Sequence, residues 1–462
     1  MNKIYDVAII GAGIGGLMTA YRLIQSNADL SVVIIEQGSK LSKRQCPAAK
    51  NNIPCCHCKI CAITSGMAGA GSASDGKFNI GTAYGGTLAK ELGETTAMDY
   101  ICQVDETLKV FADDYPELYT SNDELKLKCL QNNLQLLDMD VRHLGTDKNY
   151  STMMALINYL SERIEIKTDT ECNMVCRANN ANTFKISTSH GWLDASNVVV
   201  ATGRSGAQFV KNLCQAFKVD VEANSVDIGV RVEMKDMIWR EFSSKIYEPK
   251  ILYRTPTYGD NCRMFCFNQG GIVSAENNHG IITANGHSFA DPLKKTDNCN
   301  FAILSSIHFT EPFNQPTEYA ENISKMANMI GDGNVIVQRL GDLRMGRRTN
   351  AHRLNQGTVH PTLTATPGDL ALVLPHRILT NIIETLDALD KVAPGCANPD
   401  TLLYGCESKY YSIKPKHNNN FEIAENLYLI GDGSGICRGL SQSGAMGLYV
   451  ADKIMEVCCS EY

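Results

Sequence analysis

The 462-residue sequence lacks the features of a membrane-spanning or nucleic-acid-binding chain. No stretch reaches the roughly 18 uninterrupted apolar residues that a membrane span needs. The net charge of -7 gives no reason to expect nucleic acid or an anionic membrane as a partner. Internal repeats and low-complexity tracts are absent as well. The composition, 44% hydrophobic and 20% charged, predicts a globular chain of roughly two or three domains.

A secretory signal is also lacking. The apolar run over residues 7–20 is unsuited to that role, because Asp6 interrupts its basic flank, glycines punctuate it and a domain pattern follows directly. The 18 cysteines would indicate a disulfide scaffold only in a short secreted chain. We therefore expect a cytoplasmic protein with reduced thiols.

The N-terminal residues predict a dinucleotide-binding βαβ unit. A buried parallel strand is expected over 5–10, a helix over 15–25 and a second strand over 30–35. Gly11, Gly13 and Gly16 form G-x-G-x-x-G between the first strand and the helix, and Glu36 ends the second strand. Gly11 permits a tight turn, Gly13 lets the backbone approach a pyrophosphate, and Gly16 lets the helix pack closely. Glu36 is placed to accept hydrogen bonds from ribose hydroxyls.

The remaining pattern separates this chain from a nicotinamide dehydrogenase, which would continue with alternating strands and helices. Residues 42–87 form a loop region dense in Gly, Ser and Cys. Helices are expected over 96–113 and 150–162, and strands follow from residue 164 to an Ala-Thr-Gly turn. Residues 265–286 resemble a hairpin, and the last segment returns to strand, glycine loop and helix. We expect domain boundaries near residues 219/220 and 420/421.

Three blocks together resemble the glutathione-reductase-type flavoprotein superfamily. They are the fingerprint, Ala201-Thr202-Gly203 after a buried strand, and a late glycine-rich turn with Asp432. Within it, five segments are similar to the family of FAD-dependent dehydrogenases, or NAD(P)/FAD-dependent oxidoreductases: GAGSASDGKFNIGT (69–82), NQGGIVSAE (268–276), NGHSFA (285–290), LLYGCESKYYS (402–412) and LIGDGSGICRGLSQSGAMG (429–447). The resemblance spans nearly the whole chain.

This resemblance implies an α/β fold. It has a Rossmann-type FAD-binding domain of the three-layer ββα kind, with an inserted α+β substrate domain. The FAD-binding domain would comprise residues 1–219 and 421–462, and the substrate or cap domain residues 220–420.

The resemblance also implies an FAD site. Its residues would be Gly11, Gly13, Gly16, Glu36 and Gln37 at the adenosine diphosphate half, Ala201, Thr202 and Gly203 near the ribityl chain, Gly431 and Asp432 at the ribitol and pyrophosphate, and Arg438, Leu440 and Ser441 beside the ring. The helix starting near Gly439 would direct its N-terminus at the flavin N1/O2 edge, where reduced flavin carries negative charge.

A cysteine cluster lies between the fingerprint and residue 69. Cys46-Pro47 is followed by Cys55, Cys58 and Cys61, spaced C-x2-C-x2-C. This is similar to the ligand run of a [4Fe–4S] ferredoxin, although the Cys-Pro comes first here. Tetrahedral zinc would accept the same thiolates, with His57 as an alternative fourth ligand. The other interpretations are a Cys58–Cys61 dithiol, as in disulfide reductases of the superfamily, and buried structural thiols. We rank the metal centre first, and [4Fe–4S] ahead of zinc.

Candidates for chemistry lie in the Ser-Asp-Gly-Lys segment. Lys77, with Asp75, falls in a region expected to face the isoalloxazine, where a lysine stabilises the reduced flavin anion. A surface turn is an equal alternative. An anionic substrate could be held by Arg263, His287 and the basic group Arg344, Arg347, Arg348 and Arg353.

These observations predict an FAD-dependent oxidoreductase that transfers hydride or electrons through flavin N5. Its small-molecule substrate is not identified by the sequence. No second G-x-G-x-x-G follows residue 203, so the electron donor is either transiently docked NAD(P)H or a protein carrier acting through the cysteine cluster. The alternatives are a thiol–disulfide reductase using Cys58 and Cys61, and a noncatalytic FAD-binding accessory protein.

Overall fold

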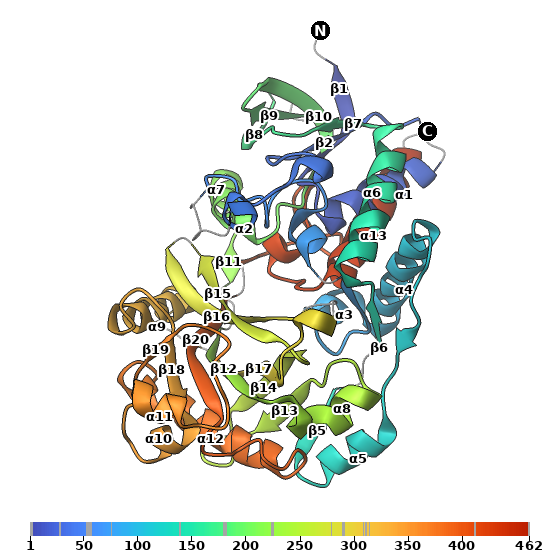
Figure 1. The fold of residues 1–462 in the computed structure, drawn as a ribbon. Helices are drawn as coiled ribbons and strands as arrows, with labels where there is room; N and C mark the ends of the chain where they lie inside the picture. The colour runs from blue at the N-terminus through green and yellow to red at the C-terminus, as the bar shows by residue number, and fades with distance from the viewer. Residues whose placement is uncertain are drawn as a thin grey trace. The chain divides into compact units, whose positions relative to one another are not determined.

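The computed structural model (Figure 1) describes residues 3–460 except 27–28, 52–57, 75, 138–139, 179–182, 223–225, 279, 289–291, 308, 310–311, 314 and 411–412. The chain divides into two compact units. Unit 1 contains Met1–Tyr119, Met139–Glu222 and Ser412–Tyr462, and unit 2 contains Thr120–Asp138 and Ala223–Tyr411.

The elements of unit 1 follow in chain order. Its helices are α1 (Ile14–Gln25), α2 (Pro47–Asn51), α3 (Leu88–Leu92), α4 (Glu94–Val110), α6 (Gly145–Ser161), α7 (Ala207–Phe217) and α13 (Leu440–Ser460). Its strands are β1 (Ile4–Ile10), β2 (Val32–Ile35), β3 (Lys77–Ile80), β4 (Leu118–Tyr119), β6 (Asp140–His143), β7 (Glu165–Lys167), β8 (Cys172–Arg177), β9 (Phe184–Thr188), β10 (Gly191–Val200), β11 (Val221–Glu222), β21 (Lys414–Pro415), β22 (Glu422–Ala424) and β23 (Leu427–Leu429).

Unit 2 holds the remaining elements. Its helices are α5 (Asp123–Leu130), α8 (Arg240–Lys245), α9 (Pro316–Ile330), α10 (Leu340–Arg344), α11 (Ala351–Asn355) and α12 (His376–Asp390). Its strands are β5 (Leu134–Leu136), β12 (Val226–Lys235), β13 (Ile251–Arg254), β14 (Asn261–Asn268), β15 (Ile272–Asn278), β16 (Ile281–His287), β17 (Asn298–Ile307), β18 (Ile336–Arg339), β19 (Thr366–Pro367) and β20 (Leu402–Tyr410).

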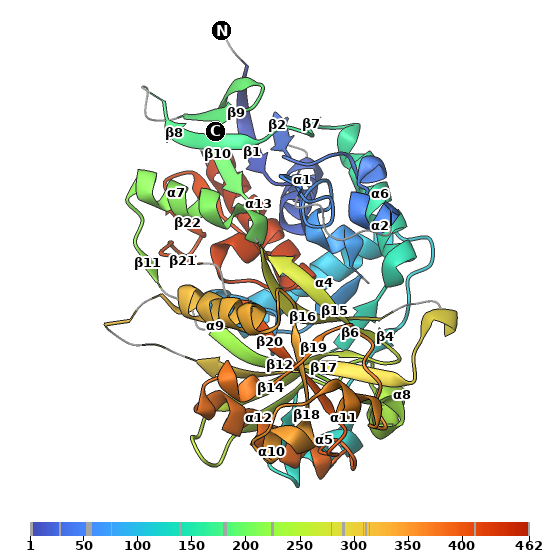
Figure 2. The same ribbon diagram turned by 60° about the vertical axis from the view of Figure 1, so that its left-hand side comes forward.

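The main sheet of unit 1 is a Rossmann sheet in the order β22-β23-β10-β1-β2-β7. Strands β23, β10, β1, β2 and β7 pair in parallel, so their carboxyl ends meet at one edge. Parallel strands of this kind are buried on both faces. This burial explains why the residues at the carboxyl ends of β1 and β2 are all apolar. Strands β8 and β9 join antiparallel to β10 as a meander, which Figure 2 shows beside β1.

Two layers pack on this sheet, one on each face, so the unit has three layers. On one face, Val7, Ile9 and Ile34 belong to the same apolar core as helices α1, α4, α6 and α13. On the other face, Ala8 and Val33 pack with the meander and α7. Alternate residues of one buried strand thus serve two cores, as a two-sided sheet requires. The three-layer Rossmann-type α/β fold predicted from the sequence is confirmed.

Unit 2 is built on an eight-stranded sheet in the order β19-β18-β20-β12-β17-β14-β13-β5. One face of its central strand β12 carries apolar side chains that pack with α5, α8, α9 and α12. The β15–β16 hairpin expected from the sequence forms, and it packs against β20 and β12.

The chain passes between the units at 222/223 and 411/412, which differ from the expected domain boundaries by three and nine residues. A larger difference is the excursion over 120–138, which the sequence analysis had kept in the first domain. There β5 pairs with β13 of unit 2, through Leu136 opposite Ile251. Among the described residues, no helix is long and apolar enough to cross a membrane.

Candidate functional site

The turn between β1 and α1 contains three glycines with different surroundings. A Cβ on Gly11, whose φ is +105°, would lie 2.5 Å from the Ala201 carbonyl oxygen, and one on Gly16 would overlap the Gly11 carbonyl. A Cβ on Gly13 would meet no protein atom within 4 Å. Gly11 and Gly16 are therefore required by packing, whereas Gly13 borders open space of the kind that a pyrophosphate occupies.

Helix α1 begins at this open space. Its N-cap is Gly13, which has no side chain that could accept a hydrogen bond from the first backbone amides. The first turn of the helix holds no acidic residue. The helix is 12 residues long, so its N-terminal amides and dipole favour a negatively charged group. The geometry thus fits the phosphates of a dinucleotide.

Glu36 follows β2 and is 5% exposed. Its Oε2 accepts a hydrogen bond from the Ala12 amide at 2.9 Å, and its Oε1 accepts from the amides of Gly38 at 2.8 Å and Gly66 at 2.9 Å. The carboxylate therefore ties the fingerprint turn to the loop around residue 66. Its role toward a ribose stays a prediction.

The loop after β2 is organised by Arg44, which the sequence analysis missed. Its guanidinium donates to the carbonyls of Ala62, Met67, Gly69 and Ile63 at 2.7–3.0 Å. Burial lowers the pKa of this guanidinium. The neighbouring Gln37, a predicted site residue, donates to Ser65 Oγ at 3.0 Å. No local sequence pattern indicates that an arginine will donate its hydrogen bonds to main-chain carbonyls.

The Ala-Thr-Gly turn follows β10. The Ala201 amide donates to the Ile10 carbonyl at 2.8 Å, which brings this turn beside the fingerprint. Thr202 Oγ1 is buried without a hydrogen-bond partner. Gly203 has φ +60° and open space where a side chain would stand.

The late glycine turn joins the same edge through β23. The Ile430 amide donates to the Val200 carbonyl at 2.9 Å, and Gly431 adopts φ +72°. Asp432 forms an ion pair with Arg204, with 2.7 Å between Nε and Oδ2. The three sequence blocks thus converge at the carboxyl edge of one sheet.

The start of α13 completes this edge. The amides of Arg438 and Gly439 donate to the Gly85 carbonyl at 2.7 and 3.2 Å. Leu440 lies against Gly71, where a Cβ would be 2.6 Å from its Cδ2. The predicted site residues of the C-terminal block therefore contact the loops before and after β3.

Several buried polar atoms here have no protein partner. They are Ser441 Oγ and Gln442 Oε1 in the first turn of α13, and Asn79 Oδ1 on β3, besides Thr202 Oγ1. Each such atom costs about 1–3 kcal/mol if left unpaired. A polar ligand at this edge would satisfy them, so the residues fit FAD. Gln442 and Asn79 are additions to the predicted set, and the only sequence signal was their place inside the two family-like segments.

Lys77 begins β3, opposite His143 on β6, and is half-buried. β3 packs against α13, so Lys77 lies on an element of the predicted site. Asp75, its predicted partner, falls outside the described residues.

The cysteine cluster is described in part. Cys46 is half-buried, Cys58 and Cys61 are exposed, and Cys55 lies outside the described residues. Burial tends to raise the pKa of the Cys61 thiol, but hydrogen bonds from Thr64 and Ile63 and the charge of Arg44 lower it overall. Within the described part of the chain, no group of three or more candidate ligands could hold a metal ion.

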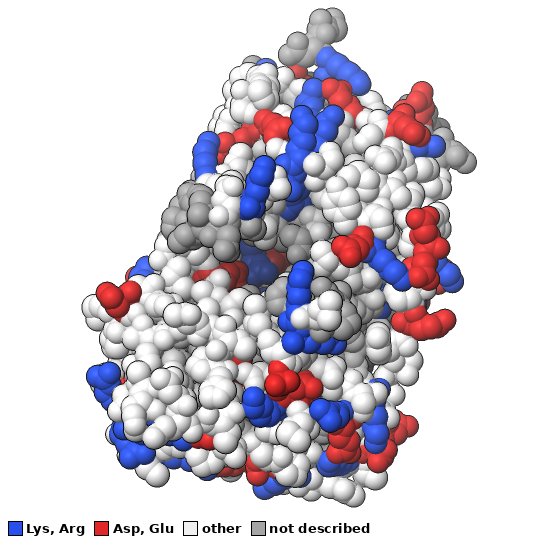
Figure 3. All heavy atoms as spheres, viewed as in Figure 1, with Lys and Arg blue, Asp and Glu red and all other residues white. Residues whose placement is uncertain are grey.

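The predicted anion-binding residues of unit 2 are engaged elsewhere or dispersed. Arg263 forms an ion pair with Asp227, and His287 is exposed at the end of β16. In the view of Figure 3, basic and acidic side chains intermingle over unit 2 without a continuous patch of one sign.

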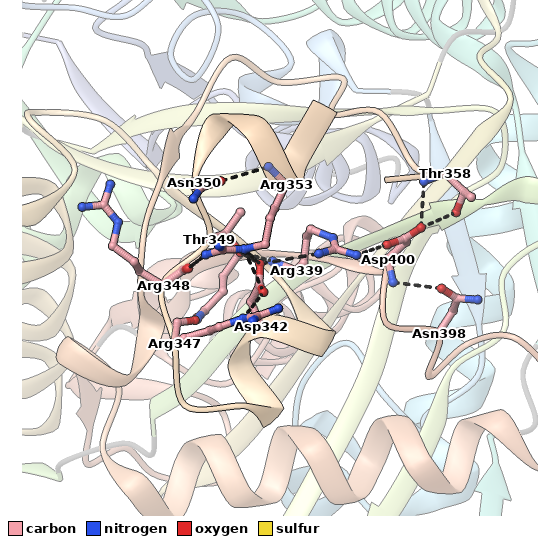
Figure 4. A network of polar contacts seen from close by, with 11 residues as sticks. Arg339, Asp342, Arg347, Arg348, Thr349, Asn350, Arg353, Thr358, Asn398 and Asp400 are labelled. Atoms are coloured by element: carbon pink, nitrogen blue, oxygen red, sulfur yellow. Dashed lines mark hydrogen bonds and ion pairs between the residues drawn. The ribbon is translucent and has the colours of Figure 1, made fainter. Parts of the chain in front are cut away.

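The arginines after α10 surround one buried carboxylate (Figure 4). Asp342 accepts from Arg347 Nε at 2.8 Å, Thr349 Oγ1 at 2.8 Å and Arg353 Nε at 3.1 Å. Burial opposes ionisation of Asp342, yet these hydrogen bonds lower its pKa overall. Arg348 points away from the network in Figure 4, and Arg344 pairs with Asp387. Two of the four arginines therefore serve the structure of this loop.

Comparisons with protein families place a model on each unit. Residues 225–410 match the family "FAD-dependent protein, C-terminal domain-like", and residues 9–48 match "NAD(P)-binding Rossmann-like domain". A search of curated proteins found no match.

The chain is also similar to solved structures of low sequence identity. L-proline dehydrogenase from P. horikoshii has 12% identity over 99% of this chain and 95% of that one, with a TM-score of 0.41. Glycine oxidase from Bacillus cereus has 14% identity over 98% and 95%, with a TM-score of 0.38. For p-nitrophenol 4-monooxygenase from Pseudomonas putida the identity is 10% over 100% and 82%, with a TM-score of 0.41.

The match over residues 9–48 agrees with the geometry of unit 1, where a turn with open space at Gly13 meets a helix N-terminus and unpaired buried polar atoms. The chain is an enzyme, a FAD-dependent oxidoreductase with a Rossmann-type nucleotide-binding unit.

Proposed function

We propose that unit 1 binds FAD in an extended form along the carboxyl edge of its sheet, in the manner of the glutathione-reductase-type superfamily. The single observation that carries this proposal is the set of unpaired buried polar atoms at this edge, namely those of Thr202, Ser441, Gln442 and Asn79. They lie on three segments that are distant in sequence: Thr202 adjoins Gly11 of the fingerprint, α13 packs against α1, and β3 packs against α13. A purely structural edge would leave no reason for their burial.

Different residues of unit 1 bind different parts of FAD. The N-terminus of α1, open at Gly13, faces the pyrophosphate, and Glu36 accepts hydrogen bonds from the ribose with the lone pairs left by its amide partners. Asp432 and Gly431 contact the ribitol and pyrophosphate side. The N-terminus of α13 stabilises negative charge on the reduced ring.

Bound FAD would supply a ring that accepts or gives a hydride or electrons at N5. Lys77, on β3, places a positive charge beside that ring and helps to hold the negative charge that reduction creates. Asp75, which the sequence predicts as a site residue together with Lys77, lies outside the described residues. The substrate is a small molecule, and we expect an anionic one. Of the basic group predicted to hold it, Arg348 is exposed and points away from the Asp342 network.

The source of electrons is either NAD(P)H, bound transiently, or a protein carrier. In the second case Cys46, Cys55, Cys58 and Cys61 would hold a [4Fe–4S] cluster that supplies electrons to the flavin. Zinc, the less favoured metal, has no redox chemistry and would make the site purely structural. The protein is expected in the cytoplasm. In support, the cysteines of the described segments are free thiols.

Anaerobic reduction tests the redox function. We expect NADH, NADPH or dithionite to bleach the visible absorption of the bound flavin, and an acceptor dye to restore it with turnover. A protein that holds FAD but passes no electrons to any dye would contradict electron transfer through the flavin.

Metal analysis of anaerobically purified protein tests the cysteine centre. About four irons with matching sulfide support the cluster, and about one zinc supports a closed structural site. Cys102→Ser is the control and should leave the metal content unchanged, because Cys102 is an exposed cysteine of α4 outside the cluster.

A second candidate is a thiol–disulfide reductase using Cys58 and Cys61. The observation in its favour is the lowered pKa of the Cys61 thiol, which increases its thiolate fraction. Absence of iron and zinc, with Cys58 and Cys61 titrating as a redox pair, would replace the metal centre by this dithiol.

A further inference from the structure

Unit 1 holds an arginine at the carboxyl edge of its sheet that the proposed function does not use. Arg204 directly follows the Ala-Thr-Gly turn and begins a short 3₁₀ helix. Its Nε lies 2.7 Å from Asp432 Oδ2, and 62% of its side chain is exposed, against 21% for Asp432. Because an exposed ion pair contributes little to stability, the fold alone gives little reason for this one.

The ion pair joins two turns that lie against each other. The short helix that begins at Arg204 contacts the one that begins at Asp432. A Cβ on Gly433 would lie 3.2 Å from the Gly203 carbonyl oxygen, so the turn after β23 packs on the turn after β10. A Cβ on Gly203 would meet no protein atom within 4 Å. Arg204 therefore adjoins a backbone position that borders open space, as Gly13 does in the fingerprint turn.

The other charges at this edge are unfavourable for a pyrophosphate. Residues 11–17 are Gly, Ala, Ile and Leu, so the fingerprint turn offers backbone amides and a helix dipole but no charged side chain. Two carboxylates, Glu36 and Asp432, follow β2 and β23 at the same edge of the sheet. Like charges repel, so an anionic ligand placed here gains from a cation that offsets them.

The guanidinium of Arg204 is able to serve two anions at once. A guanidinium carries five N–H donors in a planar fork. The ion pair with Asp432 engages Nε, and a guanidinium bound in this way still offers the N–H groups of Nη1 and Nη2 to a second acceptor. Phosphate oxygens accept such paired donors with suitable geometry. The large exposed fraction of the side chain leaves room for that contact.

We propose that Arg204 binds the pyrophosphate of FAD and that Asp432 positions it for this contact. This inference deepens the proposed function and rests on it. The ion pair holds the guanidinium at the open edge before the ligand arrives, so less side-chain freedom is lost on binding. The same guanidinium offsets the charge of Asp432, which would otherwise repel the phosphates. Arg204 thus favours FAD over riboflavin, which carries no phosphate.

The dissociation constant of FAD from the full-length protein tests the role of this charge, with flavin fluorescence as the readout. Arg204→Gln should weaken FAD binding about tenfold at low ionic strength. The loss should shrink in concentrated salt, because an exposed charge is screened. Arg204→Lys should retain part of the affinity, since a lysine keeps the charge but not the planar fork.

Arg163→Gln is the matched control. Arg163 is also an exposed arginine in an ion pair, with Glu162. It precedes β7, which runs parallel to β2, and therefore lies at the opposite edge of the sheet. FAD binding by this variant should equal that of the parent at every ionic strength.

The outcomes separate the role of Arg204 from the proposed function. A parent protein that binds no FAD contradicts the proposed function, and this inference with it. A parent protein that binds FAD, beside an Arg204→Gln variant that binds it equally well at low ionic strength, overturns only the role of Arg204. A loss of the same size at every ionic strength also overturns that role, because a disturbed fold and not a missing charge would then be responsible.

Asp432→Asn tests the positioning role in a double-mutant cycle. In the parent protein this substitution should weaken FAD binding, because the guanidinium of Arg204 is no longer held in place. In Arg204→Gln, where Asp432 faces the phosphates without a counter-charge, the same substitution should restore part of the affinity. Opposite signs in the two backgrounds are the expected result. Losses that simply add in the double variant would refute the joint action of the pair.

Discussion

At the residue scale, Gly13 and Gly16 stand in the same turn, yet a side chain meets different surroundings at each. Gly13 borders open space, and Gly16 lies against the Gly11 carbonyl. Gly13→Val should therefore fold and melt like the parent apoprotein while losing FAD, because the valine fills the pyrophosphate space. Gly16→Ala should lower the melting temperature of the apoprotein itself. Absorbance per chain after reconstitution and thermal unfolding measure the two effects.

Comparing the two variants tests whether the loop around Gly13 binds the pyrophosphate. Stoichiometric FAD in folded Gly13→Val would show that the pyrophosphate lies elsewhere. An unfolded Gly13→Val beside a stable Gly16→Ala would reverse the packing argument.

Glu36 carries a second test at this scale, because three buried amides donate to its carboxylate. Glu36→Gln replaces one acceptor oxygen by a donor and removes the charge. We expect the free energy of unfolding to fall by about 2 kcal/mol, since hydrogen bonds to charged groups contribute more than neutral ones. Gln37→Ala, which removes one bond to Ser65, should cost no more than about 1 kcal/mol. Urea denaturation compares them, and equal losses would contradict the role of Glu36.

At the element scale, α10, α11 and the loop that joins them depend on Asp342. Its side chain is fully buried and its partners span Arg347 to Arg353. Asp342→Asn removes the charge of the buried group to which the partly exposed guanidinium groups of Arg347 and Arg353 donate, and should cost about 2 kcal/mol. Asp387→Asn breaks the exposed pair with Arg344 and should cost less than about 1 kcal/mol. Denaturant unfolding at neutral pH gives both values.

The same carboxylate gives a pH dependence. Because hydrogen bonding lowers the folded-state pKa of Asp342, its contribution to stability is complete above the unfolded pKa of about 3.9. The contribution is lost as the pH falls through the folded-state value. The difference in stability between the parent and Asp342→Asn should therefore shrink on acidification. A difference that stays constant down to strongly acidic pH would mean that the ionised carboxylate is not what holds the loop.

The βαβ unit was predictable because its signals are local. The strand, the glycine turn and the acid at the end of β2 all lie within residues 4–36, and the structure places them as expected. The excursion over 120–138 was not predictable, because a three-residue strand such as β5 carries no sign of which sheet it joins. Its partner β13 comes more than a hundred residues later.

Long-range partners also limited prediction of the candidate site. The family-like blocks identified the segments, but Gln442 and Asn79 became visible only as buried atoms without partners. The burial of Arg231 on β12 was likewise not predictable, because apolar and polar residues alternate along this strand and suggest one solvent-facing side. The structure buries both sides, because the β15–β16 hairpin packs on the polar one.

At the scale of the whole molecule, the chain combines a nucleotide-binding unit made of three segments with a second unit that matches a FAD-dependent protein family over residues 225–410. The segments of unit 1 come together only in the folded chain, where β23 pairs with β10 and α13 packs against α1. Removal of residues 412–462 should therefore abolish flavin binding even though the fingerprint is intact. Flavin retention by a folded truncated chain would contradict a site that needs the C-terminal return.

The central claim is tested most directly by identifying the flavin that the purified full-length protein releases on denaturation. Chromatography of the released chromophore, with its amount per chain, distinguishes FAD from FMN. The account predicts a yellow protein that releases FAD in stoichiometric amount, because Glu36 and the α1 turn are suited to the adenosine diphosphate half that FMN lacks. Release of FMN alone, or no bound flavin after reconstitution with FAD, would contradict it.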